Sequence, residues 1–231
     1  MTARAWLSFS ENSSIRKGWH MGESRQSYLV AAESAVSLLG DPAVSASWDK
    51  PSALTEFSVA GLAGHLAHQF VRVGDVLTRN GEVPEPISLL EHYSRSPWVQ
   101  AGLDHESNLG IRRGGEAAAA AGPAILVERA QAMLDLQSSV LPGEPEDRVV
   151  SLPSGWSLLL DDFLLTRCVE LVVHADDLAT SVGLATPALP ATVVDPVVEL
   201  LAKLAVHRHG PTAVIRTLSR AERAPATISA F

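Results

Sequence analysis

The chain has 231 residues, which suits one domain or one domain with a short appendage. With 46% hydrophobic and 19% charged residues it is not a wholly disordered protein, and a net charge of −8 argues against nonspecific binding to nucleic-acid backbones. A single cysteine excludes a disulfide framework and a cysteine-rich metal site. No apolar run reaches the roughly 18 residues that a membrane span needs, so we expect a cytoplasmic protein with no nucleic-acid or membrane partner.

The hydrophobic pattern along the chain is that of helices. Residues 1–21 lack clear periodicity and carry no apolar signal-peptide core, so we expect a flexible N-terminal extension. Farther on, apolar residues recur with helical spacing between N-caps such as Ser58 and stops such as Gly40. The predicted elements are helices over 24–39, 59–79, 124–140, 161–183, 193–209 and 211–220, a weaker helix over 104–121, a loop over 41–57, a long connection over 82–103 with one helical turn near 87–93, and a short β-hairpin over 148–159.

Four long helices with a crossing connection predict a mostly α protein built as a helical bundle. Bundles hold metal sites between side chains of facing helices, so polar residues on otherwise apolar helices are the first candidates for a site.

The helix over 161–183 carries a narrow polar seam. Thr166, His174, Asp177 and Ser181 fall within about 40° of Glu170 around the helix axis, and the rest of the surface is mostly apolar. Such a helix is expected to be buried, with its seam lining an internal space. Because a buried carboxylate is costly unless it is paired, hydrogen-bonded or bound to a metal, Glu170 needs a partner there.

The helix over 59–79 repeats this pattern. Gly61, His68, Gln69 and Arg72 lie within about 60° of His65, and leucine, phenylalanine and valine residues form the opposite side. This seam supplies a histidine in place of a carboxylate.

Two seams that face each other would bring together His65, Glu170 and His174. Two histidines and one carboxylate with an open position are typical of a catalytic zinc site, and they also suit ferrous iron, manganese or nickel. The residues alone leave a second reading open, in which Glu170 and His174 form a hydrogen-bonded pair in the core and His65 is satisfied by a backbone carbonyl.

Several segments resemble the mycothiol-dependent maleylpyruvate isomerase family of the DinB-like superfamily. They are the stretch 48–54 (WDKPSAL), the stretch 57–68 (FSVAGLAGHLAH) with its histidine, the stretch 170–179 (ELVVHADDLA), and the region 108–131. The resemblance covers about residues 22–186, and its most specific part is a second-helix histidine combined with a later Glu-x-x-x-His.

The resemblance implies a DinB-like four-helix bundle over 22–186, followed by a short C-terminal segment over 187–231 that is smaller than the C-terminal domain of the isomerase itself. It implies a divalent metal, usually zinc, on His65, Glu170 and His174, and mycothiol as the thiol that meets the open position. The partners would be this thiol and a small electrophile, with the chain a monomer or a homodimer.

Three further residues are candidates for substrate binding or for support of the metal ligands. Asp177 lies one turn after His174 and would orient its imidazole, or else form a surface ion pair. Arg72 would contact substrate or thiol, or else pair between helices. Arg220 closes a stretch that resembles the family's usual ending and would meet an anionic substrate. Cys168 reads as a small buried apolar residue and not as a nucleophile.

The function that the resemblance implies is thiol activation by a metal. Addition of the thiolate to a conjugated cis alkene, followed by elimination, gives cis–trans isomerisation, whereas displacement of a leaving group gives S-transfer. The alternatives are a non-catalytic bundle that binds a small molecule, a metal-dependent hydrolase with Asp177 or His68 as general base, and a purely structural bundle.

Overall fold

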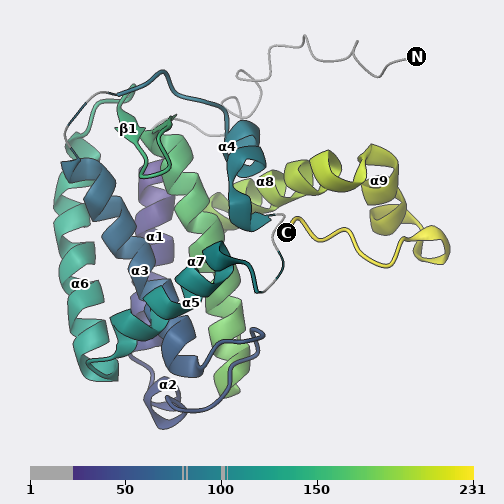
Figure 1. The fold of residues 1–231 in the computed structure, drawn as a ribbon. Coiled ribbons are helices and arrows are strands. Elements are labelled where there is room, and N and C mark those ends of the chain that lie inside the picture. Colours follow the sequence, from purple (N-terminus) through teal and green to yellow (C-terminus); the bar gives the residue numbers. More distant parts are fainter. Residues whose placement is uncertain (1–22, 80, 82, 100–101, 103) are drawn as a thin grey trace.

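The computed structural model describes residues 23–79, 81, 83–99, 102 and 104–231, so the expected N-terminal extension over 1–21 lies outside the described residues. The mostly α fold predicted from the sequence is confirmed (Figure 1). In chain order the elements are α1 (Glu23–Leu39), α2 (Pro42–Ala46), α3 (Val59–Thr78), α4 (Leu89–Arg95), the 3₁₀ turn η2 (Pro97–Val99), α5 (Glu106–Ala119), α6 (Pro123–Val140), η3 (Leu141–Gly143), β1 (Val149–Ser151), β2 (Ser157–Leu159), α7 (Leu160–Val182), α8 (Ala191–His209), α9 (Pro211–Ser219) and η4 (Ala221–Arg223).

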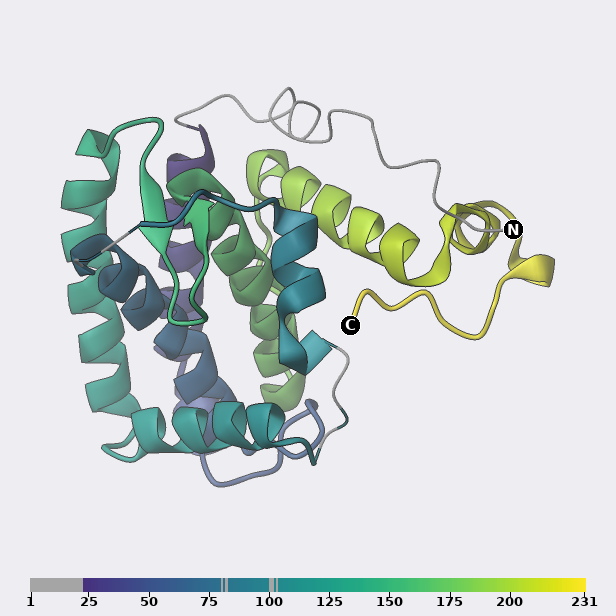
Figure 2. The same ribbon diagram turned by 45° about the horizontal axis from the view of Figure 1, so that its top comes forward.

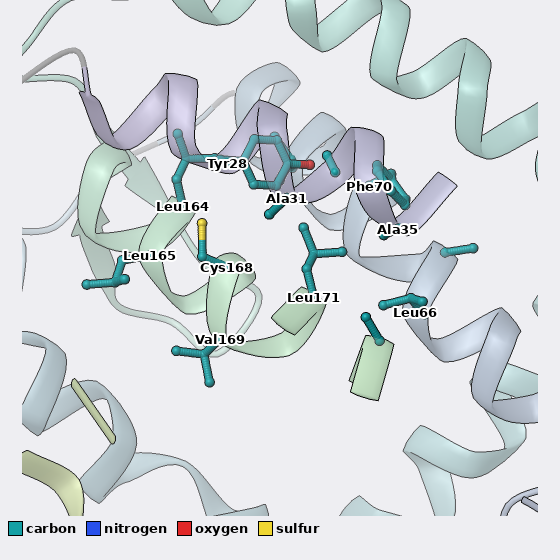
Figure 3. Close-up of a cluster of buried hydrophobic side chains, with 14 of the residues drawn as sticks. Tyr28, Ala31, Ala35, Leu66, Phe70, Leu164, Leu165, Cys168, Val169 and Leu171 are labelled. Atoms are coloured by element: carbon teal, nitrogen blue, oxygen red, sulfur yellow. The ribbon is translucent and has the colours of Figure 1, made fainter. Parts of the chain in front are cut away.

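Four helices form the bundle. α1 packs against α7 and α6, and α3 packs against the same two helices from the other side, so the four close a ring (Figure 1). Figure 3 shows the apolar side chains that fill part of the interior, drawn from α1, α3 and α7. Cys168 lies among them, fully buried, and burial raises the pKa of its thiol to about 12, as expected for an unreactive core residue. The labelled members of this cluster are Tyr28, Ala31, Ala35, Leu66, Phe70, Leu164, Leu165, Cys168, Val169 and Leu171.

Local capping sets the ends of the two helices that carry the polar seams. The Ser58 side chain accepts a hydrogen bond of 2.8 Å from the Gly61 N–H and starts α3. Gly183 ends α7 in the left-handed conformation, with φ of 75°, and Leu184 N–H returns to the Ala179 carbonyl. These ends confirm the predicted boundaries to within one residue.

Three predicted boundaries need correction. The loop expected over 41–57 contains the short helix α2, which Asp41 caps by accepting from the Ala43 N–H and which Pro42 starts. α4 spans seven residues instead of one turn near 87–93, because Ser88 caps it. α8 begins at Ala191, two residues earlier than predicted.

The predicted hairpin is present, with Val150 opposite Leu158 in an antiparallel pair. Gly155 adopts a positive φ of 90° in its turn. Trp156, which follows this glycine, donates its indole N–H to His92 Nδ1 at 3.0 Å. The hairpin therefore fixes α4 against one end of the bundle.

The C-terminal segment begins against the bundle and then leaves it. α8 packs on α7 and α1, and Ser27 Oγ donates to the Thr192 carbonyl at 3.0 Å. Figures 1 and 2 show α9 at the outer end of α8 and the tail returning toward α4. There the ring of Phe231 stacks on Tyr93, with 5.6 Å between centroids. No helix among the described residues has the length and apolar character needed to cross a membrane.

Glycines allow α5 to lie directly on α3, although the sequence marks 104–121 as a weak helix. A Cβ added at Gly64 would lie 2.0 Å from the Gly115 carbonyl oxygen, and one at Gly115 would lie 2.3 Å from the Gly61 carbonyl oxygen. The two backbones are thus in contact beside His65, whose Cβ would lie 3.4 Å from a Cβ at Gly115. Contact between the helices, and not intrinsic propensity, accounts for α5.

This contact predicts opposite effects for two neighbouring glycines. Gly115→Ala should lower the free energy of unfolding by about 1–3 kcal/mol, because the added methyl overlaps backbone that cannot move aside easily. Gly114→Ala should raise it by about 0.5–1 kcal/mol, since nothing lies within 4 Å of its added Cβ and alanine favours a helix. Urea unfolding of the full chain measures both, and equal stability of the two variants would contradict the close approach.

Candidate metal centre

His65 of α3 and Glu170 and His174 of α7 come together between the two helices. Glu170 Oε2 lies 3.3 Å from His65 Nε2 and 3.4 Å from His174 Nε2, and the two imidazole rings are 4.7 Å apart edge to face. One ligand atom from each of the three residues lies within 4.8 Å of the others. The two seams seen in the sequence do face each other.

Helix geometry explains the arrangement. Glu170 and His174 are four residues apart, so they share one face of α7. The α3–α7 contact brings His65 to that face, and the rings of Phe57 and His65 lie 5.9 Å apart. All three side chains are between 12% and 17% exposed, so they are shielded without being sealed from solvent.

Burial and mutual contact fix the charges of these groups. Burial alone would raise the pKa of the Glu170 carboxyl, but hydrogen bonds from His174 and His65 and the charge of Arg167 hold it well below its usual range. Burial lowers the pKa of His65 despite the neighbouring carboxylate. Burial also opposes protonation of His174, yet its hydrogen bonds to Asp177 and Glu170 raise its pKa to about 9. Without a metal the centre thus holds an ionised carboxylate, a neutral histidine and a protonated histidine at neutral pH.

Asp177 sits behind His174. Its Oδ2 lies 2.9 Å from His174 Nδ1, and because an ionised carboxylate only accepts, the ring nitrogen donates. The other ring nitrogen, Nε2, is then directed at Glu170 and His65. This is the carboxylate–histidine arrangement that orients metal-binding imidazoles in proteins.

Two of the three donor separations have the length expected around a single divalent ion. Two bonds of 2.0–2.1 Å at the tetrahedral angle place their donor atoms about 3.3–3.4 Å apart. The two distances to Glu170 Oε2 match this value, and they exceed the roughly 2.7–2.9 Å of a charge-assisted hydrogen bond. Two imidazoles and one carboxylate suit zinc, and equally ferrous iron, manganese or nickel.

The other candidates from the sequence fall in different places. Arg72 lies on α3, two turns after His65, and its buried Nε has no hydrogen-bond partner within the described chain. Burial lowers the pKa of Arg72 to about 10, and Arg167 lowers it further whereas Glu170 opposes the shift. Arg220 is exposed after α9 and donates to the neighbouring Ser219 carbonyl, so the structure does not bring it to the metal centre. A substrate role for Arg220 stays a prediction.

Sequence reasoning missed Arg167 and Tyr93. Arg167 is 7% exposed and contacts Gln69 on α3, and Tyr93 of α4 has a buried hydroxyl without a hydrogen-bond partner among the described residues. The signal for Arg167 was present, because it is a single cation in the apolar run Leu164–Val169. Tyr93 gave no signal, since it belongs to a long connection whose position only the folded chain defines.

Comparison with known proteins gives one family and one related structure. The family model for the mycothiol maleylpyruvate isomerase N-terminal domain matches residues 29–179. A crystal structure of the mycothiol-dependent maleylpyruvate isomerase superposes with a TM-score of 0.51 at 16% sequence identity, over 83% of this chain and 70% of that one. At this identity the superposition establishes similarity of fold. No curated protein matches the chain significantly.

The hydrogen bond to His174 predicts that Asp177 supports metal affinity. Asp177→Asn should weaken zinc binding by about 10–100-fold, as loss of such an orienting carboxylate typically does. Asp176→Asn is the matched control, because Asp176 is exposed and contacts Thr186 instead. Competition with a chromophoric chelator measures both affinities, and equal weakening in the two variants would remove the orienting role from Asp177.

The raised pKa of His174 predicts that metal affinity depends on pH. Below pH 9 the metal must displace the His174 proton, so zinc affinity should rise by about tenfold per pH unit between pH 6 and pH 8. Chelator competition at three pH values tests this, together with calorimetry in buffers of different ionisation enthalpy, which counts the released proton. A constant affinity over this range would contradict the protonated state assigned to His174.

Proposed function

The chain belongs to the mycothiol maleylpyruvate isomerase N-terminal domain family, and on that premise we propose that it is a metal-dependent isomerase that uses mycothiol as a cosubstrate. Its substrate would be a small alkene conjugated to a carbonyl, converted from the cis to the trans form. The observation that carries the proposal is the clustering of His65, Glu170 and His174, whose ligand atoms lie within 4.8 Å of one another.

The charge of this donor set suits thiol activation. A free thiol has a pKa near 8.5, so only a few per cent is thiolate at neutral pH. When bound, a divalent metal deprotonates a coordinating thiol. Because Glu170 is the one anion of the three donors, the loaded centre would retain positive charge toward an incoming sulfur.

The proposed reaction of the thiolate with the alkene is an addition followed by an elimination. The thiolate sulfur bonds to one alkene carbon, and the electron pair of the double bond moves to the conjugated carbonyl oxygen. Rotation about the resulting single bond and elimination of the same thiolate restore the alkene in the trans form. Atoms and electrons balance without an oxidant, and the thiol is regenerated.

Two donors near the centre are available to the oxygen on which charge develops. Arg72 Nε and the Tyr93 hydroxyl are both buried, and the described chain offers neither of them a hydrogen-bond acceptor. Glu170 influences the pKa of each, after the larger effect of burial. Oriented donors in a shielded site stabilise developing charge better than water does.

The proposal predicts that metal content and thiol-dependent turnover are lost together. His174→Ala should remove near-stoichiometric metal and lower isomerisation of maleylpyruvate with mycothiol by more than the 10–100-fold expected for an orienting residue. His207→Ala serves as the control, since this exposed histidine of α8 contacts Ser94. The measurements are metal analysis by mass spectrometry and absorbance of the product.

The same assay separates the other functions. Turnover that needs metal but no thiol would favour a hydrolase, and thioether formation with an electrophile that carries a leaving group would favour S-transfer. Metal and thiol binding without any conversion would indicate a binding bundle. Full metal retention in His174→Ala would contradict the ligand assignment itself.

A further inference from the structure

Arg167 is a buried arginine whose contacts are all neutral. It is 7% exposed, and its Nε donates to Thr166 Oγ1 at 3.1 Å. One terminal nitrogen donates to Gln69 Oε1, and the guanidinium carbon lies 5.2 Å from the centre of the Phe163 ring. Within the described residues it forms no ion pair with a carboxylate. A buried cation is costly unless other groups compensate its charge, and Arg167 acts on the carboxylate of Glu170, whose pKa it lowers.

The contacts of Arg167 join the two helices that carry the ligand residues. Gln69 is 1% exposed, and while its Oε1 accepts from Arg167, its Nε2 donates to the His65 carbonyl at 3.0 Å. Arg167 itself lies one turn before Glu170 on α7. The two hydrogen bonds of the Gln69 amide therefore link the turn of α3 that carries His65 to Arg167, in the turn of α7 that carries Glu170.

The charge of Arg167 acts on groups from α1, α3, α4 and α7. It lowers the pKa of the Glu170 carboxyl, whereas burial raises the pKa of the Cys168 thiol to about 12 and lowers that of His92 to about 4, and Tyr93 and Tyr28 stay neutral. The titratable groups whose pKa Arg167 influences are Tyr28 from α1, His65, His68 and Arg72 from α3, His92 and Tyr93 from α4, and Cys168 and Glu170 from α7.

We propose that Arg167 is a positioning residue of the metal centre, which sets the spacing of His65 and Glu170 through Gln69 and whose fixed charge favours a thiolate over a neutral thiol at the open position. This inference rests on the proposed function, since it needs a metal and a thiol. It adds to that function a residue outside the metal ligands that selects the charge of the bound thiol. A purely structural arginine would tie the helices together but leave the ionisation of the thiol unchanged.

The test uses the full chain loaded with cobalt(II) and 2-mercaptoethanol as the probe thiol. Thiolate-to-cobalt absorption, followed against pH, gives the midpoint at which the thiol binds as thiolate. R167M removes the charge with similar volume and should raise this midpoint by about one pH unit, which is about a tenfold loss of thiolate complex below the midpoint. R167K retains the charge and should keep the wild-type midpoint. Coincident midpoints for wild type and R167M would overturn the proposal.

A second variant isolates the positioning role. Q69M keeps the charge of Arg167 but removes both hydrogen bonds of the amide, so it should weaken cobalt binding in equilibrium dialysis without moving the midpoint. If circular dichroism shows that R167M does not fold, the cobalt affinities of R167K and Q69M test the proposal instead. Wild-type cobalt affinity in both variants would overturn it. A wild-type chain that binds no cobalt would instead refute the proposed function, and this inference with it.

Discussion

The rest of the structure depends on one buried carboxylate, that of Glu170. An ionised carboxylate on an apolar helix inside a bundle destabilises the fold unless positive or donating groups surround it. His174 is supplied by the same helix at four residues' distance and the charge of Arg167 acts from the preceding turn, but His65 comes from α3. The packing of α3 on α7 is therefore tied to the electrostatics of the site as well as to its apolar contacts.

Around this carboxylate the long helices and the short segments α4, the hairpin and the C-terminal tail contribute different groups. Two of the four long helices, α3 and α7, hold the candidate ligand residues, and the contact between Gly61, Gly64 and Gly115 supports α3 directly behind His65. One of the two polar groups proposed to meet a substrate, the hydroxyl of Tyr93, lies on the short helix α4 and not on the four long helices. That helix is held by Trp156 of the hairpin and covered by Phe231 of the tail.

The folded chain also places cations around the candidate metal centre of an acidic protein. The sequence carries a net charge of −8, yet Arg72 and Arg167 interact electrostatically with each other and with Glu170. Two cations shielded from water are costly, and a bound anion would relieve that cost.

Much of the fold could be predicted from the sequence because its causes are local. Ser58 and Gly183 set helix ends through their own backbone and side-chain geometry, and Gly155 shapes the hairpin turn in the same way. The polar seams were visible too, since helical periodicity places Glu170, His174 and Asp177 on one face without reference to the rest of the chain. The short helix α2 was not predicted, because five residues are too few to show a helical period.

What only the tertiary structure decided concerns pairs of residues far apart in the chain. Periodicity gives two seams but not their alignment, so the residues alone favoured a core hydrogen-bonded pair at Glu170 and His174 over a metal centre. The packing of the whole core brings His65 within 3.3 Å of Glu170, sets Gln69 against Arg167, and leaves Arg220 exposed after α9. The physical reason is that a helix face is fixed by consecutive residues, whereas the facing of two helices is fixed by the summed packing of every element between them.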